Sequence, residues 1–159
     1  MKIVSILFVC LGNICRSPMA EGIFLDILKR EKVSSDFEVD SAGLLSVHQG
    51  ELPDSRMRYF AGKRGYTFNH HSRPFSRRDF DKFDMIIGMD DQIIAGLKQL
   101  AMTVEEEAKI FRMTDFCRNI EATHVPDPYY GGEKGFENLI DLLEDACEGL
   151  YNKIVEKKK

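Results

Sequence analysis

The residues of this chain that are best suited to chemistry lie together in the short segment Cys10–Pro18. Consecutive backbone N–H groups in such a segment can turn inward and, with the N-terminus of a following helix, form a cradle for an anion. Gly12 and Asn13 are residue types that tolerate the positive φ angles of a tightly curled loop. Arg16 adds a planar guanidinium that matches phosphate oxygens, and these donors would also stabilise a thiolate on Cys10. The segment therefore predicts a bound phosphoryl group with a cysteine nucleophile beneath it.

A second segment, Val125–Gly132, contains the acid that cleavage of a phosphate ester requires. Pro126 and Pro128 fix the backbone on both sides of Asp127, which suits a carboxyl group that must reach a defined point. The leaving oxygen of the ester needs a proton, and Asp127 can deliver it as a general acid. On its own an Asp-Pro pair is more typical of a turn, and the first segment alone could be a buried cysteine with a surface arginine. The two segments together indicate a mechanism.

The elements that must position these segments alternate between strands and helices. The apolar run Ile3–Val9 is typical of a strand that is buried on both faces, and Ser17 with Pro18 can cap and open the helix that follows. Further strands are predicted at Phe37–Ser41, Asp84–Met89 and Lys109–Arg112, and further helices at Pro53–Arg64 (closed by Gly65), after a cap at Asp90 or Asp91, and along the apolar stripe from Phe136 to Ile154. This order predicts an α/β fold with a parallel sheet covered on both faces. Because ligands bind beyond the carboxyl ends of such strands, the segment after Val9 is the expected site.

Composition and charge exclude several classes of protein. Of the 159 residues 43% are hydrophobic and 30% charged, so we expect one globular domain spanning residues 1–159 rather than a disordered chain. A net charge of −4 is opposite to the basic footprint of a nucleic-acid-binding protein. The charge is uneven, because Asp54–Lys82 carries eight basic and three acidic residues whereas Asp115–Glu156 carries three basic and ten acidic residues. The basic stretch would either steer an anionic substrate or form a solvated helix face.

The four cysteines and the apolar segments indicate the compartment. Cys10, Cys15, Cys117 and Cys147 are too few for a disulfide scaffold and lack zinc-ligand spacing, so we expect reduced thiols and a cytoplasmic location. Cys147 lies on an apolar helical stripe and is expected in the core. The run Ile3–Val9 is at the short limit for a signal peptide and lacks a small residue for cleavage, and no apolar stretch is long enough to span a membrane.

Cys10–Pro18 together with Asp127–Tyr130 resembles the low-molecular-weight protein tyrosine phosphatases. The resemblance extends over nearly the whole chain, including Asp40–Gly43, Met89–Asp90 and the terminal helix. It implies a single three-layer domain with a four-stranded parallel sheet and a phosphate-binding loop after the first strand. It also implies hydrolysis of phosphotyrosine in proteins, and of small aryl phosphates, through a phosphocysteine and without a metal ion or other cofactor.

The resemblance further implies a role for each residue of the site. Cys10 would be the nucleophile, Arg16 would bind the phosphoryl oxygens, and Ser17 would donate to the Cys10 thiolate. Asp127 would protonate the leaving phenol and then activate the water that breaks the thiophosphate. The residues implied to line or shape the substrate site are Leu11, Gly12, Asn13, Ile14, Cys15, Tyr129 and Tyr130, and those implied to hold the loop through Asn13 are Ser41 and His70.

The resemblance also bears on two further positions, one that matches the family pattern and one that departs from it. Cys15 resembles the family's second loop cysteine, which implies a reversible disulfide with Cys10 after oxidation. Val47 departs from the family pattern, because many members carry an aromatic residue there, so one wall of the aryl slot would be thinner. His48 is a candidate for the same wall, although we expect both it and His124 to be exposed to solvent.

Two other functions remain open on the sequence. A thiol-coupled arsenate reductase would share this fold and anion loop but would need further cysteines beside the loop, where Cys117 and Cys147 are not expected. A phosphotyrosine-binding module without activity would lack the nucleophile or the acid, and both are present. The expected partners are a phosphotyrosine protein or an aryl phosphate, with phosphate and vanadate as competing ligands and neither nucleic acid nor membrane. The chain is expected to be a monomer or a weak dimer.

Overall fold

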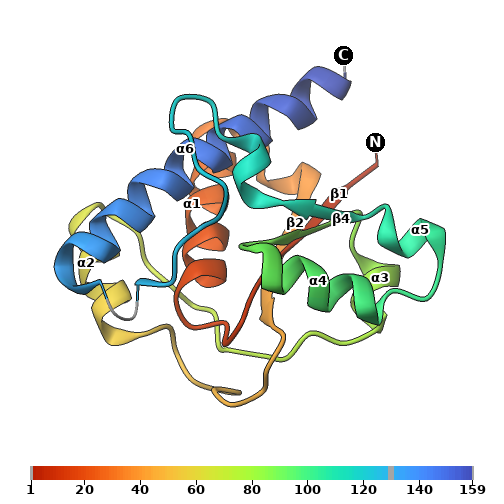
Figure 1. Cartoon of the computed structure of the whole chain (residues 1–159). Coiled ribbons are helices and arrows are strands. Elements are labelled where there is room, and N and C mark those ends of the chain that lie inside the picture. Colours follow the sequence, from red (N-terminus) through yellow and green to blue (C-terminus); the bar gives the residue numbers. More distant parts are fainter. Residues whose placement is uncertain (1, 129–130, 159) are drawn as a thin grey trace.

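The computed structural model describes residues 2–128 and 131–158 of the chain. Its strands are β1 (Val4–Cys10), β2 (Phe37–Gly43), β3 (Met85–Gly88) and β4 (Ile110–Arg112). Its helices are α1 (Arg16–Arg30), α2 (Ser55–Lys63), α3 (Arg78–Lys82), α4 (Asp91–Leu100), α5 (Val104–Glu107) and α6 (Gly132–Lys158), with 3₁₀ turns at Ser34–Asp36 and Met113–Phe116. Strands and helices therefore alternate along the chain, and Figure 1 shows the helices arranged around a central sheet.

The four strands form one parallel sheet in the order β2-β1-β3-β4. β1 is paired on both sides, with Cys10 opposite Gly43 of β2 and Val9 opposite Gly88 of β3. A central parallel strand has both of its faces covered, which explains why β1 is buried from Ser5 onward and why its sequence is an apolar run. The predicted four-stranded parallel sheet is confirmed.

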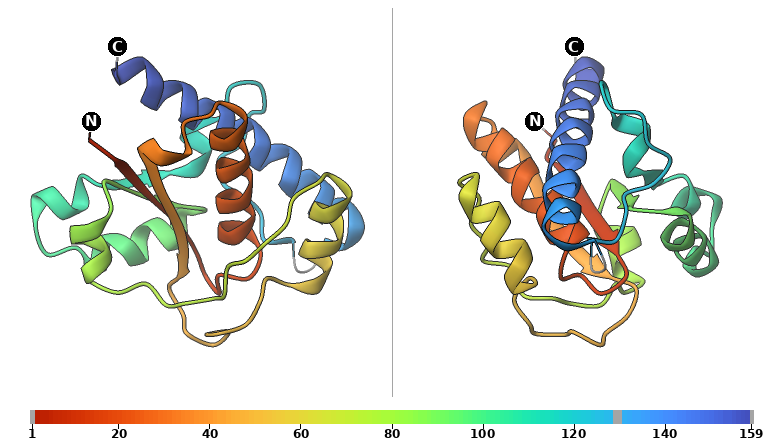
Figure 2. Two further views of the ribbon diagram at one scale, coloured as in Figure 1. Left: turned by 180° about the vertical axis from the view of Figure 1, so that it is seen from behind. Right: turned by 60° about the vertical axis from the view of Figure 1, so that its left-hand side comes forward.

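Alternate side chains of β1 face two different layers of helices. Ile6 and Phe8 belong to a large apolar core with residues of α1, α2 and α6, whereas Leu7 and Val9 belong to a smaller core with residues of α3 and α4. Figure 2 shows the same division, with α1, α2 and α6 on one side of the sheet and α3 and α4 on the other. The fold is therefore the three-layer α/β arrangement that the sequence predicts.

The first helix begins earlier than the sequence pattern predicts. Cys15 is its N-cap and Arg16 its first residue, so Ser17 and Pro18 lie inside the first turn. Pro18 fits there because the first four backbone N–H groups of a helix have no partner within the helix. The Ser17 hydroxyl bonds to side chains of the preceding loop instead of to the helix backbone. The prediction that Ser17 caps the helix is therefore wrong.

The later elements follow the predicted order with shifts of one or two residues. Helix α2 is capped by Asp54 rather than opened at Pro53, and it closes as predicted before Gly65, whose φ is 90°. Asp90 caps α4 by accepting the Ile93 N–H at 2.8 Å. The short helices α3 and α5 escape the sequence analysis because segments of five and four residues are too short to show a helical apolar period. No helix in the described ranges is both long and apolar enough to cross a membrane.

Candidate active site

Residues 11–15 form a tight loop that leaves the carboxyl end of β1 and turns directly into α1. Of the two residues predicted to take a positive φ, only Asn13 does, at 58°. Gly12 serves a different purpose, because a Cβ atom there would lie 3.0 Å from Cδ2 of His48. The prediction for Gly12 is therefore wrong in its reason, since the position needs space rather than conformational freedom.

Cys10 and this loop line a cavity of about 140 Å³. The other residues that line it are Leu11, Gly12, Ile14, Cys15, Arg16, Leu45, Val47, His48 and Asp127. Cys10 Sγ lies 2.9 Å from Oγ of Ser17, and Asn13 Nδ2 donates to the same oxygen at 2.7 Å. The Ser17 hydroxyl also lies 3.4 Å from the Ala42 carbonyl oxygen, and the Cys10 sulfur at 2.9 Å is the nearer acceptor once it is a thiolate, which the Ser17 proton would then stabilise.

Arg16 is buried beside Cys10, with 6% of its side chain exposed. Its Nη1 donates to Oδ2 of Asp90 at 2.7 Å and to the carbonyl oxygen of Val125 at 3.0 Å. Among the described residues nothing bonds to Nε or Nη2 of Arg16, so these donors remain for a bound oxyanion. Burial alone would raise the pKa of Asp90, but the hydrogen bonds from Arg16 and from the Ile93 N–H outweigh it and lower that pKa below the ordinary value. Asp90 is therefore a carboxylate, and in this form it holds the Arg16 guanidinium in place.

Asn13 is held from several directions by neighbouring segments. Its Nδ2 donates to Oγ of Ser41 at 3.0 Å, and its Oδ1 accepts from Nε2 of His70 at 2.7 Å and from the Arg73 N–H at 3.1 Å. Buried polar side chains with every atom bonded fix one conformation, which suits a loop whose amides must converge on one point. Ser41 and His70 thus both bond to the Asn13 side chain, from the side of the loop away from the cavity.

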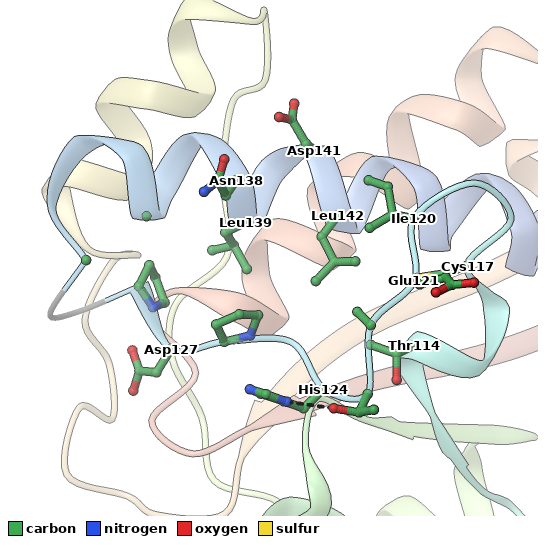
Figure 3. A pocket seen from close by; sticks show the side chains of 16 residues that line it. Thr114, Cys117, Ile120, Glu121, His124, Asp127, Asn138, Leu139, Asp141 and Leu142 are labelled. Carbon is green, nitrogen blue, oxygen red and sulfur yellow. Dashed lines mark hydrogen bonds between the residues drawn. The ribbon is translucent and has the colours of Figure 1, made fainter.

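Asp127 lies at the edge of two cavities. One is the cavity above Cys10, and the other is a larger one of about 1040 Å³ between the acid segment and α6. Figure 3 shows the larger cavity, with Leu139 and Leu142 pointing from α6 toward the segment that carries Asp127. We assign the candidate active site to the smaller cavity, because it alone of the two contains Cys10 and Arg16. Tyr129 and Tyr130, predicted to line the same site, lie outside the described residues.

The outer walls of the smaller cavity are mostly apolar. Val47 is 70% exposed at the rim, in the position where the sequence analysis expects a thin wall. His48 lies over Gly12 and pairs with Glu51 through Nδ1 at 2.9 Å, and 37% of its side chain is exposed, so the predicted exposure holds for the side chain although the residue as a whole is half-buried. His124 is exposed as predicted.

The remaining cysteines differ in position and ionisation. Burial raises the pKa of the Cys15 thiol, which keeps it protonated beside Cys10. Cys147 is buried in the core as predicted, with Sγ near the Ala20 carbonyl oxygen, and burial raises its pKa as well. Cys117 is half-buried and lines the larger cavity, and neither Cys117 nor Cys147 lines the cavity above Cys10.

The sequence analysis missed several groups that hold the site. Asp90 was expected only as a cap, yet it also binds Arg16, and its place directly after β3 at the carboxyl edge of the sheet is the signal that could have revealed this. Ser72 donates through Oγ to the Gly12 carbonyl oxygen at 3.0 Å. The Arg73 N–H and the Val125 carbonyl are backbone groups, so the residue types at these positions could not have predicted the two contacts.

Comparison with known proteins identifies the family. The sequence profile of the family described as low molecular weight phosphotyrosine protein phosphatase matches residues 5–159. The chain belongs to this family. The low molecular weight protein-tyrosine-phosphatase YfkJ of Bacillus subtilis is 38% identical to it over 98% of this chain and 99% of that protein. The low molecular weight phosphotyrosine protein phosphatase of Gallus gallus is 37% identical over 96% of each.

Solved structures agree with this assignment to the low molecular weight phosphatases. A protein tyrosine phosphatase from Entamoeba histolytica with Hepes in its active site matches with a TM-score of 0.94 and 47% identity, over 98% of this chain and 99% of that one. A drosophila arginine phosphatase matches with a TM-score of 0.87 and 33% identity, over 97% of this chain and 98% of that one. The chain is thus an enzyme of the protein tyrosine phosphatase class.

Proposed function

We propose that this phosphatase hydrolyses aryl phosphate monoesters, and phosphotyrosine in proteins above all, through a phosphocysteine on Cys10. Phosphotyrosine hydrolysis in general follows from membership of the family. The observation that carries the proposed mechanism is that Cys10, Arg16 and Asp127 line one cavity of about 140 Å³. A nucleophile, a cation and an acid at one small cavity are the groups that covalent phosphoryl transfer needs.

The substrate dianion would be bound before any bond changes. Its phosphoryl oxygens would accept from the backbone N–H groups of residues 11–16 and from Nε and Nη2 of Arg16, at the N-terminus of α1 where the helix dipole favours an anion. Asp90 keeps the Arg16 guanidinium in place for this contact. Inorganic phosphate and vanadate would compete for the same donors.

The proposed reaction has two steps that share one acid. In the first, the Cys10 thiolate attacks phosphorus, the S–P bond forms, the bond from phosphorus to the phenolic oxygen breaks, and Asp127 gives its proton to that oxygen. In the second, the Asp127 carboxylate takes a proton from water, the water oxygen attacks phosphorus, and the S–P bond breaks to return the thiolate and free phosphate. The Ser17 hydroxyl, 2.9 Å from the sulfur, would stabilise the thiolate before the first step and as it leaves in the second.

The walls of the cavity favour an aryl leaving group. Leu11 and Ile14 are apolar residues of the loop itself, and Val47 stands at the rim. Apolar side chains suit a phenyl ring better than a charged guanidinium, which would need acceptors in these positions. The related drosophila protein is described as an arginine phosphatase, so phosphoarginine is the informative contrast. We therefore expect phosphotyrosine to be preferred to phosphoarginine.

A substrate panel assayed in the presence of a chelator tests the proposal. We expect turnover of p-nitrophenyl phosphate and a phosphotyrosine peptide, weak turnover of phosphoarginine, and no thiol-dependent reduction of arsenate. Cys10→Ser should abolish turnover while phosphate and vanadate still bind, because the loop amides and Arg16 remain. Turnover by Cys10→Ser within about tenfold of the wild-type rate would rule out the covalent route. Arsenate reduction that depends on Cys117 or Cys147 would favour the reductase instead.

A further inference from the structure

The carbonyl groups of Cys10 and of the phosphate loop, residues 11–15, are bonded by segments outside the loop. The bonds run to Cys10 from the Leu44 N–H at 3.0 Å, to Leu11 from the Leu45 N–H at 2.9 Å, to Gly12 from Oγ of Ser72 at 3.0 Å, and to Ile14 from the Asp54 N–H at 2.8 Å. In a trans peptide the carbonyl and the N–H that follows it point in opposite directions, and every peptide bond in the described ranges is trans. Carbonyls that are bonded on the outside therefore leave N–H groups directed toward the inside, as binding of an oxyanion requires.

Ser72 differs from the other donors because it acts through its side chain. The three backbone N–H groups are present whatever side chain stands at their positions, whereas the bond to Gly12 depends on the Ser72 hydroxyl. The bonds that hold the neighbouring Asn13 reach its side-chain amide and do not contact the Gly12 carbonyl. The peptide between Gly12 and Asn13 therefore relies on one hydroxyl for its outer anchor.

The direction of the Gly12 carbonyl matters for an anion in the cavity. Gly12 lines the cavity above Cys10 and Ser72 does not, so the bond between them draws the carbonyl away from the cavity. Glycine changes backbone conformation easily, because it has no Cβ. A Gly12 carbonyl that turned inward would place the negative end of its dipole against the phosphoryl oxygens and would turn the attached N–H away from them.

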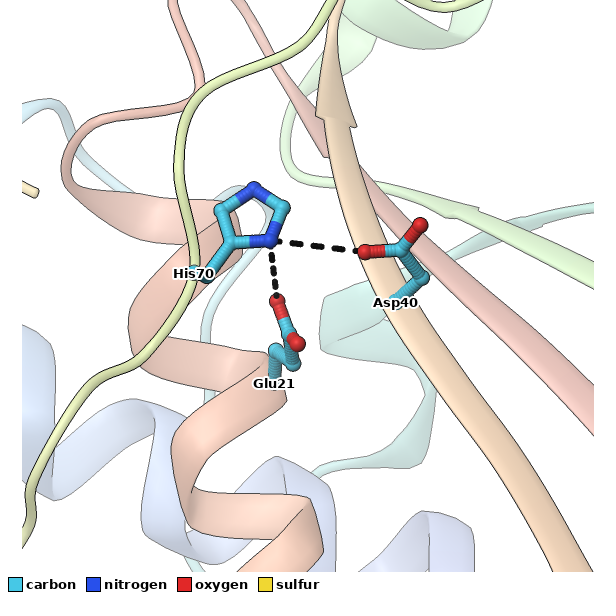
Figure 4. Close-up of side chains that lie close together, drawn as sticks. All are labelled: Glu21, Asp40 and His70. Atoms are coloured by element: carbon cyan, nitrogen blue, oxygen red, sulfur yellow. Dashed lines mark ion pairs between the residues drawn. The ribbon is translucent and has the colours of Figure 1, made fainter. Parts of the chain in front are cut away.

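Ser72 is held in a fixed place from which its hydroxyl can act. The residue is 3% exposed, and its backbone accepts from the Gly50 N–H and donates to the Glu51 carbonyl oxygen, both at 2.7 Å. Two positions earlier, His70 forms ion pairs of 3.4 Å with Glu21 of α1 and Asp40 of β2, as Figure 4 shows. The segment that carries Ser72 is thus attached to the framework of the fold.

The same segment connects the loop to the outer wall of the cavity. The Glu51 carboxylate lies 2.9 Å from Nδ1 of His48, and the His48 ring packs against Gly12 and lines the cavity. Gly12 is therefore enclosed by His48 and Ser72, which Glu51 joins to each other. Replacement of Ser72 by alanine would remove the hydroxyl and leave these backbone bonds in place.

We propose that Ser72 is a positioning residue for phosphate binding. Its hydroxyl holds the Gly12 carbonyl outward, so that the inner face of the loop presents N–H groups to the phosphoryl oxygens. Ser72 touches neither the substrate nor the reacting atoms. The proposal rests on the proposed function, because the loop has to be the place where the phosphoryl group binds.

Direct binding of inorganic phosphate and vanadate to Ser72→Ala tests the proposal. Calorimetry should show the affinity for both anions lowered by about tenfold, with a similar fall in kcat/KM for p-nitrophenyl phosphate. Complete loss of one oxyanion donor costs about 10²–10³-fold, and here a donor would be misdirected rather than removed. Ser72→Thr keeps the hydroxyl and should bind phosphate more tightly than Ser72→Ala. Wild-type affinity for phosphate and vanadate in Ser72→Ala would overturn the proposal.

Ser5→Ala is the matched control for a purely structural effect. Ser5 is 6% exposed, and its Oγ donates to the Lys82 carbonyl oxygen at 3.0 Å near the other end of β1 from Cys10. Its loss should lower the melting temperature but leave anion affinity and kcat/KM unchanged. Equal weakening of phosphate binding by Ser5→Ala and Ser72→Ala would reduce Ser72 to a stabilising residue and overturn the proposal. A wild-type protein that binds no phosphate would contradict the proposed function itself, which distinguishes the two failures.

Discussion

Cys10 and Asp127 reach the same cavity from segments that are far apart in the sequence. Cys10 ends the central strand β1, while Asp127 lies in the segment that leads from the 3₁₀ turn Met113–Phe116 to α6. The Val125 carbonyl beside that segment is bound to Arg16, so the guanidinium contacts both the phosphate loop and the base of the acid segment. Arg16 therefore helps to hold the acid segment beside the phosphate loop.

Removal of the Asp127 carboxyl should have an effect that depends on the leaving group. Asp127→Ala should slow phosphotyrosine cleavage by about 10²–10⁴-fold, because a phenol of ordinary acidity needs a proton in order to leave. For an ester of a very acidic phenol the loss in the phosphorylation step should be much smaller, because that oxygen leaves as an anion. Pre-steady-state kinetics on a series of aryl phosphates measures this step separately.

The control for this substitution is Glu121→Gln. Glu121 lines the larger cavity but not the cavity above Cys10, so its removal should leave the rate and the leaving-group dependence unchanged. The same fractional loss for every leaving group in Asp127→Ala would show that Asp127 is not the proton donor.

Peroxide should convert the two loop cysteines into a disulfide. Oxidation of the Cys10 thiolate gives a sulfenic acid, and the neighbouring Cys15 thiol then displaces water from it to form the S–S bond, which added thiols reverse. Cys147 should stay reduced, because its burial and raised pKa keep it as a thiol away from solvent. Peptide mass spectrometry after mild exposure distinguishes the outcomes, and sulfonic acid on Cys10 with a free Cys15 would contradict a protective role.

At the scale of elements, the junction between β3 and α4 supports both halves of the site. Asp90 caps α4 and binds Arg16, and the Val125 N–H donates to the Met89 carbonyl oxygen at 2.8 Å. The junction therefore anchors the start of α1 and the acid segment at once. Its contribution can be measured by removing the charge of Asp90 while its capping oxygen is kept.

Asp90→Asn should lower the free energy of unfolding by about 1–3 kcal/mol at neutral pH, because a largely buried guanidinium loses its charged partner. The pKa of Asp90 is lowered by folding, so its contribution is present above the ordinary carboxyl pKa and is lost as the pH falls through the lower, folded value. Urea unfolding from pH 7 to below about pH 4 should therefore show the difference from wild type shrinking toward acid.

Asp54→Asn is the matched control for Asp90→Asn. Asp54 also caps a helix, but its partner Arg56 is 45% exposed, so the loss should stay below about 1 kcal/mol. An Asp90→Asn difference that is independent of pH, or no larger than that of Asp54→Asn, would contradict a stabilising ion pair between Asp90 and Arg16.

Local signals were enough to predict the layered sheet but not the contacts that hold the site. The apolar run of β1 and the loop after it could be read directly, because strand burial and loop chemistry depend on neighbouring residues. The second role of Asp90 and the support from Ser72 depend on partners 74 and 60 positions away, which no local pattern encodes. The prediction that Ser17 caps the helix failed for the same reason, because its hydroxyl lies against the sulfur of Cys10, seven positions earlier in the chain.

At the scale of the whole molecule, basic side chains of one part of the sequence form ion pairs with acidic side chains of another part. Arg64, at the end of α2, bonds to Glu137, Asp141 and Glu144 along α6, and Arg77 bonds to Glu106. Arg64 and Arg77 of the basic stretch are therefore paired with acids from other segments, while the choice between a steering field and a solvated face stays a prediction for the rest of the stretch.

Arg64→Gln should lower stability without affecting catalysis. Loss of charge-assisted bonds from a mostly buried guanidinium should reduce the free energy of unfolding by about 1–2 kcal/mol. The value of kcat/KM for p-nitrophenyl phosphate, and its dependence on salt, should match wild type. If kcat/KM instead falls and its salt dependence flattens, the basic stretch steers the anionic substrate after all.

The most direct test of the covalent mechanism is detection of the phosphorylated enzyme itself. Asp127→Ala should accumulate the intermediate during turnover of an activated aryl phosphate, because formation needs little acid help while water attack has lost its base. Rapid denaturation in alkali, where the S–P bond is stable, followed by peptide mass spectrometry should then find one phosphoryl group on Cys10, and none in the Cys10→Ser/Asp127→Ala protein. A phosphoryl group on any other residue, or release of the phenol in an amount that matches the enzyme with no phosphorylated Cys10, would contradict the mechanism.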